Sequence, residues 1–237
     1  MRILADLHTH TIASGHAYST INELALAAAQ KGLQGLALTD HGPALPGGPH
    51  RYHFCAMRFI PPSISGVRIF RGVEANILNQ QGDLDLDQEL LAELDFVMAG
   101  LHEACGFCGR GIDLNTQAVL AAMENPRVKC ISHPGNPVFP LHYEEIVKGA
   151  LRTGTALEIN NSSLGVSRKG SSGNCREIVR LCAETGARVL VGSDAHISQG
   201  VGVFDDALQL IKEVGLAEEQ VLNASWEGLL AFLGREG

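Results

Sequence analysis

The residue types best suited to metal chemistry lie near both ends of the chain. His8 and His10 follow the apolar run 3–5, and a second pair, Asp194 and His196, follows the apolar run 189–193. Because successive side chains of a strand alternate between faces, residues two positions apart point the same way. If the sheet closes into a barrel, its first and last strands become neighbours. We therefore expect the two pairs to meet, and to meet around metal.

Similar side chains follow most of the other apolar runs. Of the ten histidines, six close such a run, and His16 lies in the loop after the first. The full set of candidate ligands is His8, His10, His16, His41, Glu74, His102, His133, Asp194 and His196. Imidazole and carboxylate groups without thiolates suit zinc, manganese or iron, and the excess of imidazole favours zinc. A tetrahedral site takes about four ligands, so this set predicts two or three ions.

Two acidic residues stand directly beside candidate ligands. Asp40 precedes His41, and Glu103 follows His102. In a continuing strand each would point to the opposite face from its neighbour. We therefore expect both to support the ligands by hydrogen bonds or salt bridges, and not to bind metal.

The elements that must position these residues alternate along the chain. Seven short apolar runs cover residues 3–7, 33–39, 67–73, 96–101, 128–132, 155–159 and 188–193. Segments of helical period lie between them, at 24–29, 117–123, 146–151 and 178–183, and Ser225 is a candidate N-cap for a closing helix over 226–233. This alternation predicts parallel strands with right-handed crossovers. Seven units without a Gly-x-Gly-x-x-Gly motif after the first strand favour an α/β barrel, whose active site lies at the C-terminal ends of the strands.

Length and composition indicate one domain covering residues 1–237. The chain is 45% hydrophobic and 19% charged, typical of a compact globular protein. It shows no secretory signal and no apolar run long enough to span a membrane, which predicts a cytoplasmic location. The six cysteines lack the spacing of a disulfide scaffold and are expected to be reduced, with Cys105 and Cys108 as ordinary loop thiols.

The acidic charge restricts the partners. A formal net charge of −8 gives no long-range attraction to nucleic acid, whose binding depends on neutralising phosphates with Lys and Arg. Extended DNA or RNA is therefore disfavoured. A small anion attracted by locally bound cations remains compatible with this charge.

The ordered series of motifs resembles the polymerase and histidinol phosphatase (PHP) superfamily. The resemblance covers residues 6–196, and several stretches are similar to the small stand-alone bacterial PHP phosphatases that have a trinuclear zinc site. The superfamily motifs are Asp6-Leu7-His8-Thr9-His10, His16, Thr39-Asp40-His41-Gly42, Glu74, His102, Ser132-His133-Pro134 and Gly192-Ser193-Asp194-Ala195-His196. The stretches similar to the phosphatase branch are 16–20, 133–137, 158–163 and 167–170.

This resemblance implies a fold and an arrangement of three ions. The fold would be a distorted, TIM-like (β/α)7 barrel. The first ion would be held by His8, His10, Glu74 and Asp194; the second, bridged by Glu74, by His102 and His133; and the third by His16, His41 and His196. It also allows a homotrimer.

Three divalent cations against two carboxylates would leave a local charge of about +4, which attracts anions. Such a centre can activate a hydroxide for in-line attack on a small phosphomonoester, with Glu74 and Asp194 as catalytic ligands. The leaving group could take its proton from metal-bound water or from a nearby acid such as His53. Candidate substrate contacts are Ser162, Arg168, Lys169 and Arg58. Arg168 and Lys169 could bind the phosphate, with a solvated charge pair as an equal alternative, and Ser162 could donate a hydroxyl or merely cap its loop. Arg58 could belong to a lip over the substrate.

Two other functions remain open. PHP domains attached to DNA polymerases are associated with phosphodiesterase or exonuclease activity, which is a second candidate. A non-catalytic metal-binding PHP domain is a third. The motifs resemble the generic branch more than the dedicated histidinol phosphatases, so the sequence does not name the substrate. The metal identity is open too, since the same ligands accept manganese or iron.

Overall fold

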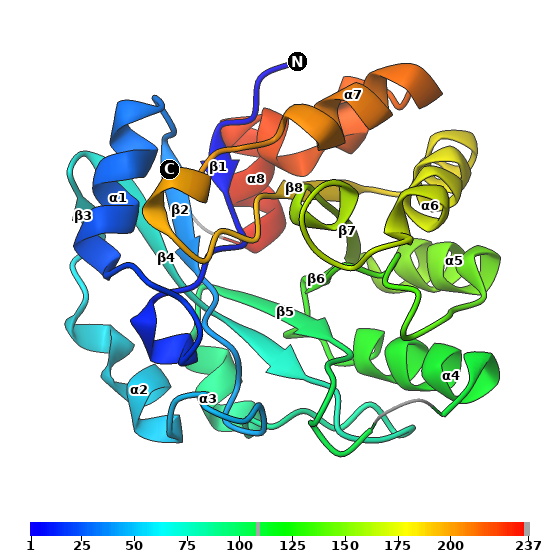
Figure 1. Cartoon of the computed structure of the whole chain (residues 1–237), viewed down its shortest axis with the longest axis horizontal. Helices are drawn as coiled ribbons and strands as arrows, with labels where there is room; N and C mark the ends of the chain where they lie inside the picture. The colour runs from blue at the N-terminus through cyan, green and yellow to red at the C-terminus, as the bar shows by residue number, and fades with distance from the viewer. Residues whose placement is uncertain (108–109, 235–237) are drawn as a thin grey trace.

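The computed structural model describes residues 1–107 and 110–234, and its centre is a nearly closed barrel of parallel strands (Figure 1). Strands pair with their neighbours in chain order, apart from the two-residue β3 (Ser63–Ile64), which lies antiparallel to β4. The parallel strands are β1 (Ala5–Asp6), β2 (Gly35–Leu38), β4 (Val67–Asn76), β5 (Phe96–Gly100), β6 (Cys130–Ile131), β7 (Ala156–Asn160) and β8 (Val189–Gly192). The predicted single-domain, seven-stranded α/β barrel is confirmed.

Eight α-helices of the described residues surround this barrel (Figure 1). They are α1 (Ile21–Gln30), α2 (Arg51–Ala56), α3 (Gln88–Glu93), α4 (Ile112–Met123), α5 (Tyr143–Thr153), α6 (Ser171–Thr185), α7 (Asp205–Val214) and α8 (Trp226–Leu233). Helix α1 begins with a capping box, in which Thr20 and Glu23 each satisfy the other's backbone N–H. The predicted cap of α8 is confirmed, because the Ser225 side chain accepts a hydrogen bond from Gly228 N.

The end of the barrel at the N-termini of the strands is filled by apolar side chains. Leu7, Phe70, Phe96 and Met98 are buried there against leucines of α8, which closes this end. Residues Ala5 and Leu7 belong to this cluster. The regular strand β1 ends at Asp6, before the two histidines that follow it. The strand predicted over residues 3–7 is therefore limited to Ala5–Asp6.

The first and last strands meet, as predicted, but few backbone bonds join them. Near the C-terminal ends of the strands, His10 N donates to Ala195 O at 2.9 Å. Towards the other end, the side chain of Asn223 bridges the gap, since its Nδ2 donates to Ala5 O at 2.9 Å and to Val191 O at 2.8 Å. A buried amide thus completes the barrel where the backbones lie too far apart to pair.

Five cysteines of the described chain, at positions 55, 105, 130, 175 and 182, are free thiols. Cys108, the other thiol expected in this loop, lies outside the described residues. Cys105 is buried, and its thiol donates to Asn76 Oδ1 at 3.2 Å. It is therefore more enclosed than the loop thiol expected from the sequence.

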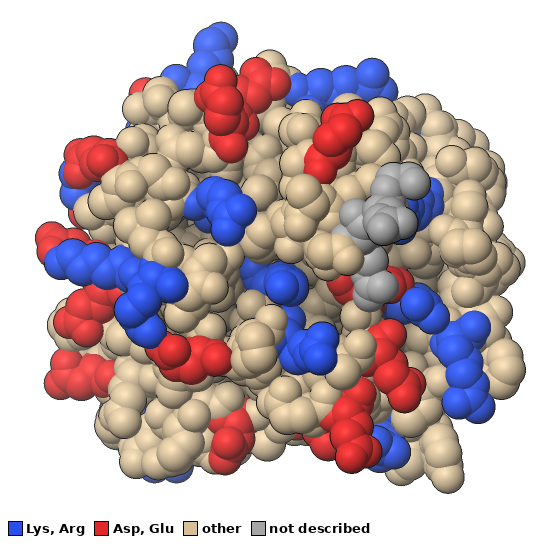
Figure 2. Space-filling view, turned by 180° about the vertical axis from the view of Figure 1, so that it is seen from behind, with Lys and Arg blue, Asp and Glu red and all other residues tan. Residues whose placement is uncertain are grey.

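Acidic and basic side chains are interspersed on the face seen in Figure 2. No continuous basic surface covers the visible part of that face. None of the helices in the described ranges combines the length and hydropathy needed to cross a membrane.

Candidate metal centre

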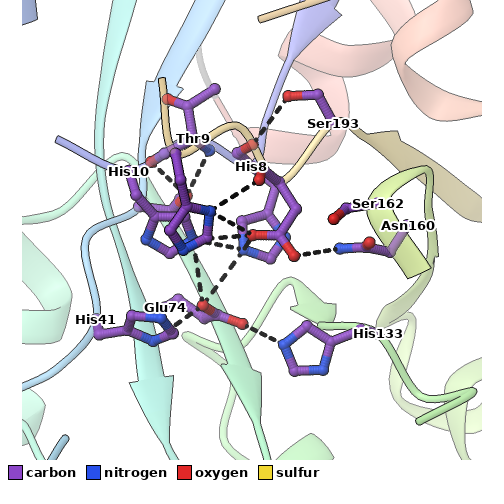
Figure 3. A network of polar contacts seen from close by, with 12 residues as sticks. His8, Thr9, His10, His41, Glu74, His133, Asn160, Ser162 and Ser193 are labelled. Carbon is purple, nitrogen blue, oxygen red and sulfur yellow. Dashed lines mark hydrogen bonds and ion pairs between the residues drawn. The ribbon is translucent and has the colours of Figure 1, made fainter. Parts of the chain in front are cut away.

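Glu74, in the second half of β4, lies at the middle of a cluster of histidines (Figure 3). Its side chain is almost fully buried, and its two oxygens face different partners. Oε2 lies 3.1 Å from His41 Nδ1, 3.3 Å from His8 Nε2 and 3.6 Å from His10 Nε2. Oε1 lies 2.7 Å from His133 Nε2 and 3.0 Å from His102 Nε2. A carboxylate placed in this way can be shared by two ions.

Asp194 is the second carboxylate of the cluster. Its Oδ1 faces the histidines, at 3.2 Å from His10 Nε2 and 3.5 Å from His8 Nε2. Its Oδ2 accepts hydrogen bonds from Arg168 Nη1 at 2.7 Å and from Asn160 Nδ2 at 3.2 Å. One oxygen is therefore directed to the candidate metal site, while the other is held by a cation and an amide.

Hydrogen bonds on the far side of each ring orient His8 and His10. His8 Nδ1 lies 2.6 Å from Glu158 Oε1, and His10 Nδ1 lies 3.1 Å from Ser14 Oγ. The Ser14 hydroxyl gives its one proton to Asp40 at 2.7 Å, so it accepts from His10 Nδ1–H. Both rings then direct Nε2 inwards, and the two Nε2 atoms are 3.1 Å apart.

A proton or a cation must lie between these two nitrogens, because two lone pairs at this distance repel. Two nitrogens bound to one tetrahedral zinc ion at the usual bond lengths would lie about 3.3 Å apart. Burial lowers the pKa of His8, but the carboxylates of Glu158, Glu74 and Asp194 raise it well above its usual value. Without metal, this pKa keeps a proton on His8 that a bound cation would replace.

The ionisation states of the other groups also suit metal binding. Burial raises the pKa of Glu74, but the surrounding histidines, His8 foremost, hold it well below its usual value. Burial also raises the pKa of Asp194, but His8 and Arg168 hold this pKa well below its usual value. Burial lowers the pKa of His133 to about 4. At neutral pH the cluster therefore presents two carboxylate anions and a neutral imidazole at His133.

Unsatisfied atoms test whether metal fits this site. Within the described residues, His41 Nδ1, Glu74 Oε2 and Asp194 Oδ1 are buried without a well-aligned hydrogen bond, and their close polar neighbours are other candidate ligands. Such atoms are costly unless something binds them, and a cation would bind all three. In each of three groups, the candidate ligand atoms all lie within 4.8 Å of one another. The groups are His8, His10 and Asp194; His41, Glu74 and His102; and His10, His41 and His196. The donor set and its geometry fit bound metal.

All nine predicted ligands gather here. His133 joins through its contact with Glu74. His16 is the most exposed member, and its ring centroid lies 4.9 Å from that of His196 and 5.2 Å from that of His41. The structure therefore collects side chains that span residues 8–196 of the sequence.

The backbone around the cluster is unusually constrained. His133, Arg168 and Asp194 have positive φ angles of 31°, 48° and 57°, in a region that non-glycine residues rarely adopt. Each costs on the order of 1–3 kcal/mol, which the surrounding contacts must offset. Gly192 makes room in the interior, since a Cβ there would lie 2.2 Å from Glu158 Oε1 and 2.8 Å from His8 Cβ.

A cleft of about 530 Å³ opens beside the cluster, and we call it the mouth cleft. Ser162, Ser167 and Arg168 line it together with His16, His41, His102, Asp194 and His196. Its remaining wall includes the apolar residues Leu45, Pro46, Leu101 and Phe139. The predicted phosphate contacts Arg168 and Ser162 therefore lie next to the candidate ligands.

The other two predicted substrate contacts, Arg58 and Lys169, and the candidate acid His53 lie elsewhere. Arg58 lines a separate pocket with Arg68 and Arg71, and its guanidinium stacks on Phe59 at 5.0 Å. Lys169 is exposed and is not among the described residues that line the mouth cleft. His53 lines a third, apolar groove, and its Nε2 lies 3.1 Å from Asp40 Oδ2.

The sequence reasoning missed two polar residues inside the barrel. Glu158 and Asn160 lie on β7, the strand that supplies none of the predicted ligands, and both are buried beside ligands from other strands. A sequence signal was available, because they are polar residues two positions apart in an otherwise apolar run and therefore share one face. Asp40, in contrast, has the expected supporting position, where it accepts from Thr11, Ser14 and His53.

A parallel barrel with buried imidazoles and carboxylates at the C-terminal ends of its strands defines a metal-binding (β/α) barrel protein. The profile of the PHP domain matches residues 6–132. The chain is also 52% identical over 229 residues to a probable phosphatase of Syntrophotalea carbinolica, covering 97% of this chain and 95% of that protein. The chain therefore belongs to the PHP family, as its motifs predicted.

A second relative agrees with this membership, and two solved structures have a similar fold. A probable phosphatase of Caldanaerobacter subterraneus subsp. tengcongensis is 47% identical, over 98% of this chain and 92% of that protein. Histidinol phosphate phosphatase from Lactococcus lactis, solved with zinc, L-histidinol and phosphate, has a TM-score of 0.61 at 15% identity, covering 92% and 95% of the two chains. A putative histidinol phosphatase from Listeria monocytogenes has a TM-score of 0.62 at 19% identity, covering 84% and 97%. These two structures share the fold.

Proposed function

We propose that this protein is a metal-dependent phosphatase that hydrolyses a small phosphomonoester at a three-ion centre. The observation that carries the proposal is the placement of Glu74, whose two oxygens face separate sets of histidines beside a cleft lined by Arg168. The names of the relatives support a phosphatase. The zinc, L-histidinol and phosphate in the Lactococcus lactis structure support zinc and a small phosphorylated substrate.

We assign the ligands to three ions, with zinc preferred and manganese or iron as alternatives. His8, His10, Glu74 and Asp194 would hold the first ion; Glu74, His102 and His133 the second; and His16, His41 and His196 the third. The grouping of His8, His10 and Asp194 supports the first assignment, and the grouping of His10, His41 and His196 supports part of the third. When bound, such ions polarise phosphoryl oxygens and lower the pKa of coordinated water.

Arg168 is the residue of this chain best placed to bind the phosphoryl group. Its side chain is only 18% exposed and lines the mouth cleft. All its hydrogen bonds with described residues, to Ser163, Ser167 and Asp194, use Nη1, so Nε and Nη2 can donate to a substrate oxygen. The Asp194 contact would hold this guanidinium beside the first ion.

The mouth cleft also limits the leaving group. Phosphate held near Arg168 would leave the alcohol portion beside the apolar wall of Leu45, Leu101 and Phe139. A volume of about 530 Å³ suits a small organic group and not a nucleic-acid duplex. His53 contacts Asp40 and does not line this cleft among the described residues, so its role as the acid stays a prediction.

The test combines elemental analysis with turnover of p-nitrophenyl phosphate. We expect about three metals per chain, loss of activity with a chelator, and recovery with zinc or manganese. Fewer than two metals after metal-replete growth, with turnover indifferent to chelator, would contradict the proposal. Faster hydrolysis of bis-p-nitrophenyl phosphate would favour a phosphodiesterase. Retained metal without turnover over a phosphomonoester panel would favour a non-catalytic metal-binding domain.

A further inference from the structure

Glu158 connects two parts of the metal centre that come from different strands. Its Oε1 lies 2.6 Å from His8 Nδ1, on the ring that follows β1. Its Oε2 accepts a hydrogen bond from the backbone N–H of His133, which follows β6, at 2.7 Å. In the ligand assignment above, His8 belongs to the first ion and His133 to the second. Both contacts are buried.

The chemistry of these contacts requires a carboxylate. When metal takes Nε2 of His8, the remaining proton is on Nδ1, so the ring is a donor towards Glu158. The backbone of His133 is also a donor. A carboxylate accepts from both at once, whereas the amide of glutamine has one acceptor oxygen and one donor nitrogen.

Glutamine at this position would therefore leave one of two faults. If its oxygen faced His133 N, its NH₂ would face His8 Nδ1 and favour the tautomer that carries the proton on Nε2, the nitrogen needed for metal. If its oxygen faced His8, the N–H of His133 would lose its buried acceptor. His133 has a φ of 31°, so it depends on such contacts to keep its conformation.

The surrounding chain holds Glu158 in this double contact. Asn160 Nδ2 donates both to Glu158 Oε2 and to Asp194 Oδ2, each at 3.2 Å, which adds a third ligand to the same network. Gly192 leaves the space that the pair of Glu158 and His8 occupies. The side chain of Glu158 is therefore fixed from both sides.

We propose that Glu158 is a positioning residue that couples the first and second ion sites, by fixing the tautomer of His8 and the backbone of His133 together. This inference rests on the metal-binding part of the proposed function and on no particular substrate. Loss of one such partner typically lowers metal affinity 10–100-fold. Because Glu158 serves two ligands, its loss should weaken two ions and not one.

The experiment measures zinc binding by competition with a chromophoric chelator, together with elemental analysis, for full-length wild type, Glu158→Gln, Glu158→Asp and Glu219→Gln. Glu219 is exposed and far along the chain, so its substitution controls for the loss of one negative charge. Circular dichroism of the chelator-treated proteins compares their folds. Nitrogen-15 spectra of the histidine rings report the His8 tautomer in the zinc-loaded proteins.

For Glu158→Gln we expect two of the ions to bind about 10–100-fold more weakly, an unchanged metal-free fold, and a changed His8 ring signal. Glu219→Gln should bind like wild type. Glu158→Asp keeps both acceptors on a shorter side chain and should bind more tightly than Glu158→Gln. Weakening of only one ion, or equal affinities for the Asp and Gln variants, would overturn the proposal.

Two further comparisons keep the result interpretable. If Glu158→Gln does not fold, the zinc affinities of Glu158→Asp are compared with those of wild type. If the two proteins bind the first and second ions equally tightly, the proposed coupling is overturned. If wild type binds three ions and Glu158→Gln loses affinity for two, but wild type hydrolyses no phosphomonoester, the coupling stands and the phosphatase proposal fails. The two proposals can therefore fail separately.

Discussion

The two neighbouring histidines of the first motif are oriented in different ways. His8 is held directly by a carboxylate, Glu158, at 2.6 Å. His10 is held through a hydroxyl, because Ser14 lies between its ring and the carboxylate of Asp40. The direct contact is charge-assisted, whereas the first contact of the relayed one is between neutral groups and should be weaker. This pair of candidate ligands therefore depends on two separate supports of unequal strength.

The largest expected effect comes from substituting Glu74, which faces His8 and His10 with one oxygen and His102 and His133 with the other. Glu74→Gln should lower the metal content by more than one equivalent per chain, because in the proposed assignment the two carboxylate oxygens of Glu74 would serve two ions. Elemental analysis after metal-replete purification measures this loss, with Glu219→Gln as the exposed control. A variant that kept all its metal would show that the supports of His8 and His10 hold the ions without a shared ligand.

A smaller effect should follow from a substitution that crowds only the contact between Glu158 and His8. Gly192→Ala places a methyl group within 2.2 Å of Glu158 Oε1 and 2.8 Å of His8 Cβ, so the pair must separate. We expect a loss of folding stability of about 1–3 kcal/mol, as for other overpacked interiors. We also expect zinc affinity to fall about 10-fold, as for a lost partner of a ligand.

Gly173→Ala is the matched control, because this glycine lies in α6 and a Cβ there meets nothing within 4 Å. It should leave zinc affinity unchanged and raise stability by about 0.5–1 kcal/mol. Thermal unfolding and the chelator competition measure both quantities. Equal zinc affinities for the two alanine variants would show that the contact between Glu158 and His8 does not limit binding.

The same comparison separates what the sequence could predict from what it could not. The candidate ligands could be predicted because all of them except His16 directly follow an apolar run, and the C-terminal ends of parallel strands meet at one end of a barrel. Glu158 was missed because its partners are 150 residues away, at His8, and 25 away, at His133. Ser14 was missed because a short 3-10 helix, Ile12–Ser14, turns it back towards His10. Such contacts depend on loop conformation and on the packing between strands.

Sequence reasoning was also weak for side chains on long loops. Arg58 and Arg168 are both basic residues outside the strands, yet only Arg168 of the two lines the mouth cleft. Arg58 follows α2 in the 3-10 helix Met57–Phe59, where the direction of the chain brings it onto Phe59 and not into the cleft. Periodicity carries no information about that direction.

The smallest expected effect tests the relayed support of His10. Ser14→Ala removes the acceptor of His10 Nδ1–H and a longer contact, at 3.3 Å, from the backbone N–H of His41, while Asp40 keeps hydrogen bonds from Thr11 and His53. Zinc affinity should therefore fall by less than the 10-fold or more expected when the direct partner of His8 is lost. The chelator competition measures this, with Ser172→Ala, an exposed serine of α6, as the control. A loss as large as that of Glu158→Gln would mean that a neutral relay orients a ligand as strongly as a carboxylate, and the difference between the two histidines would then have no energetic meaning.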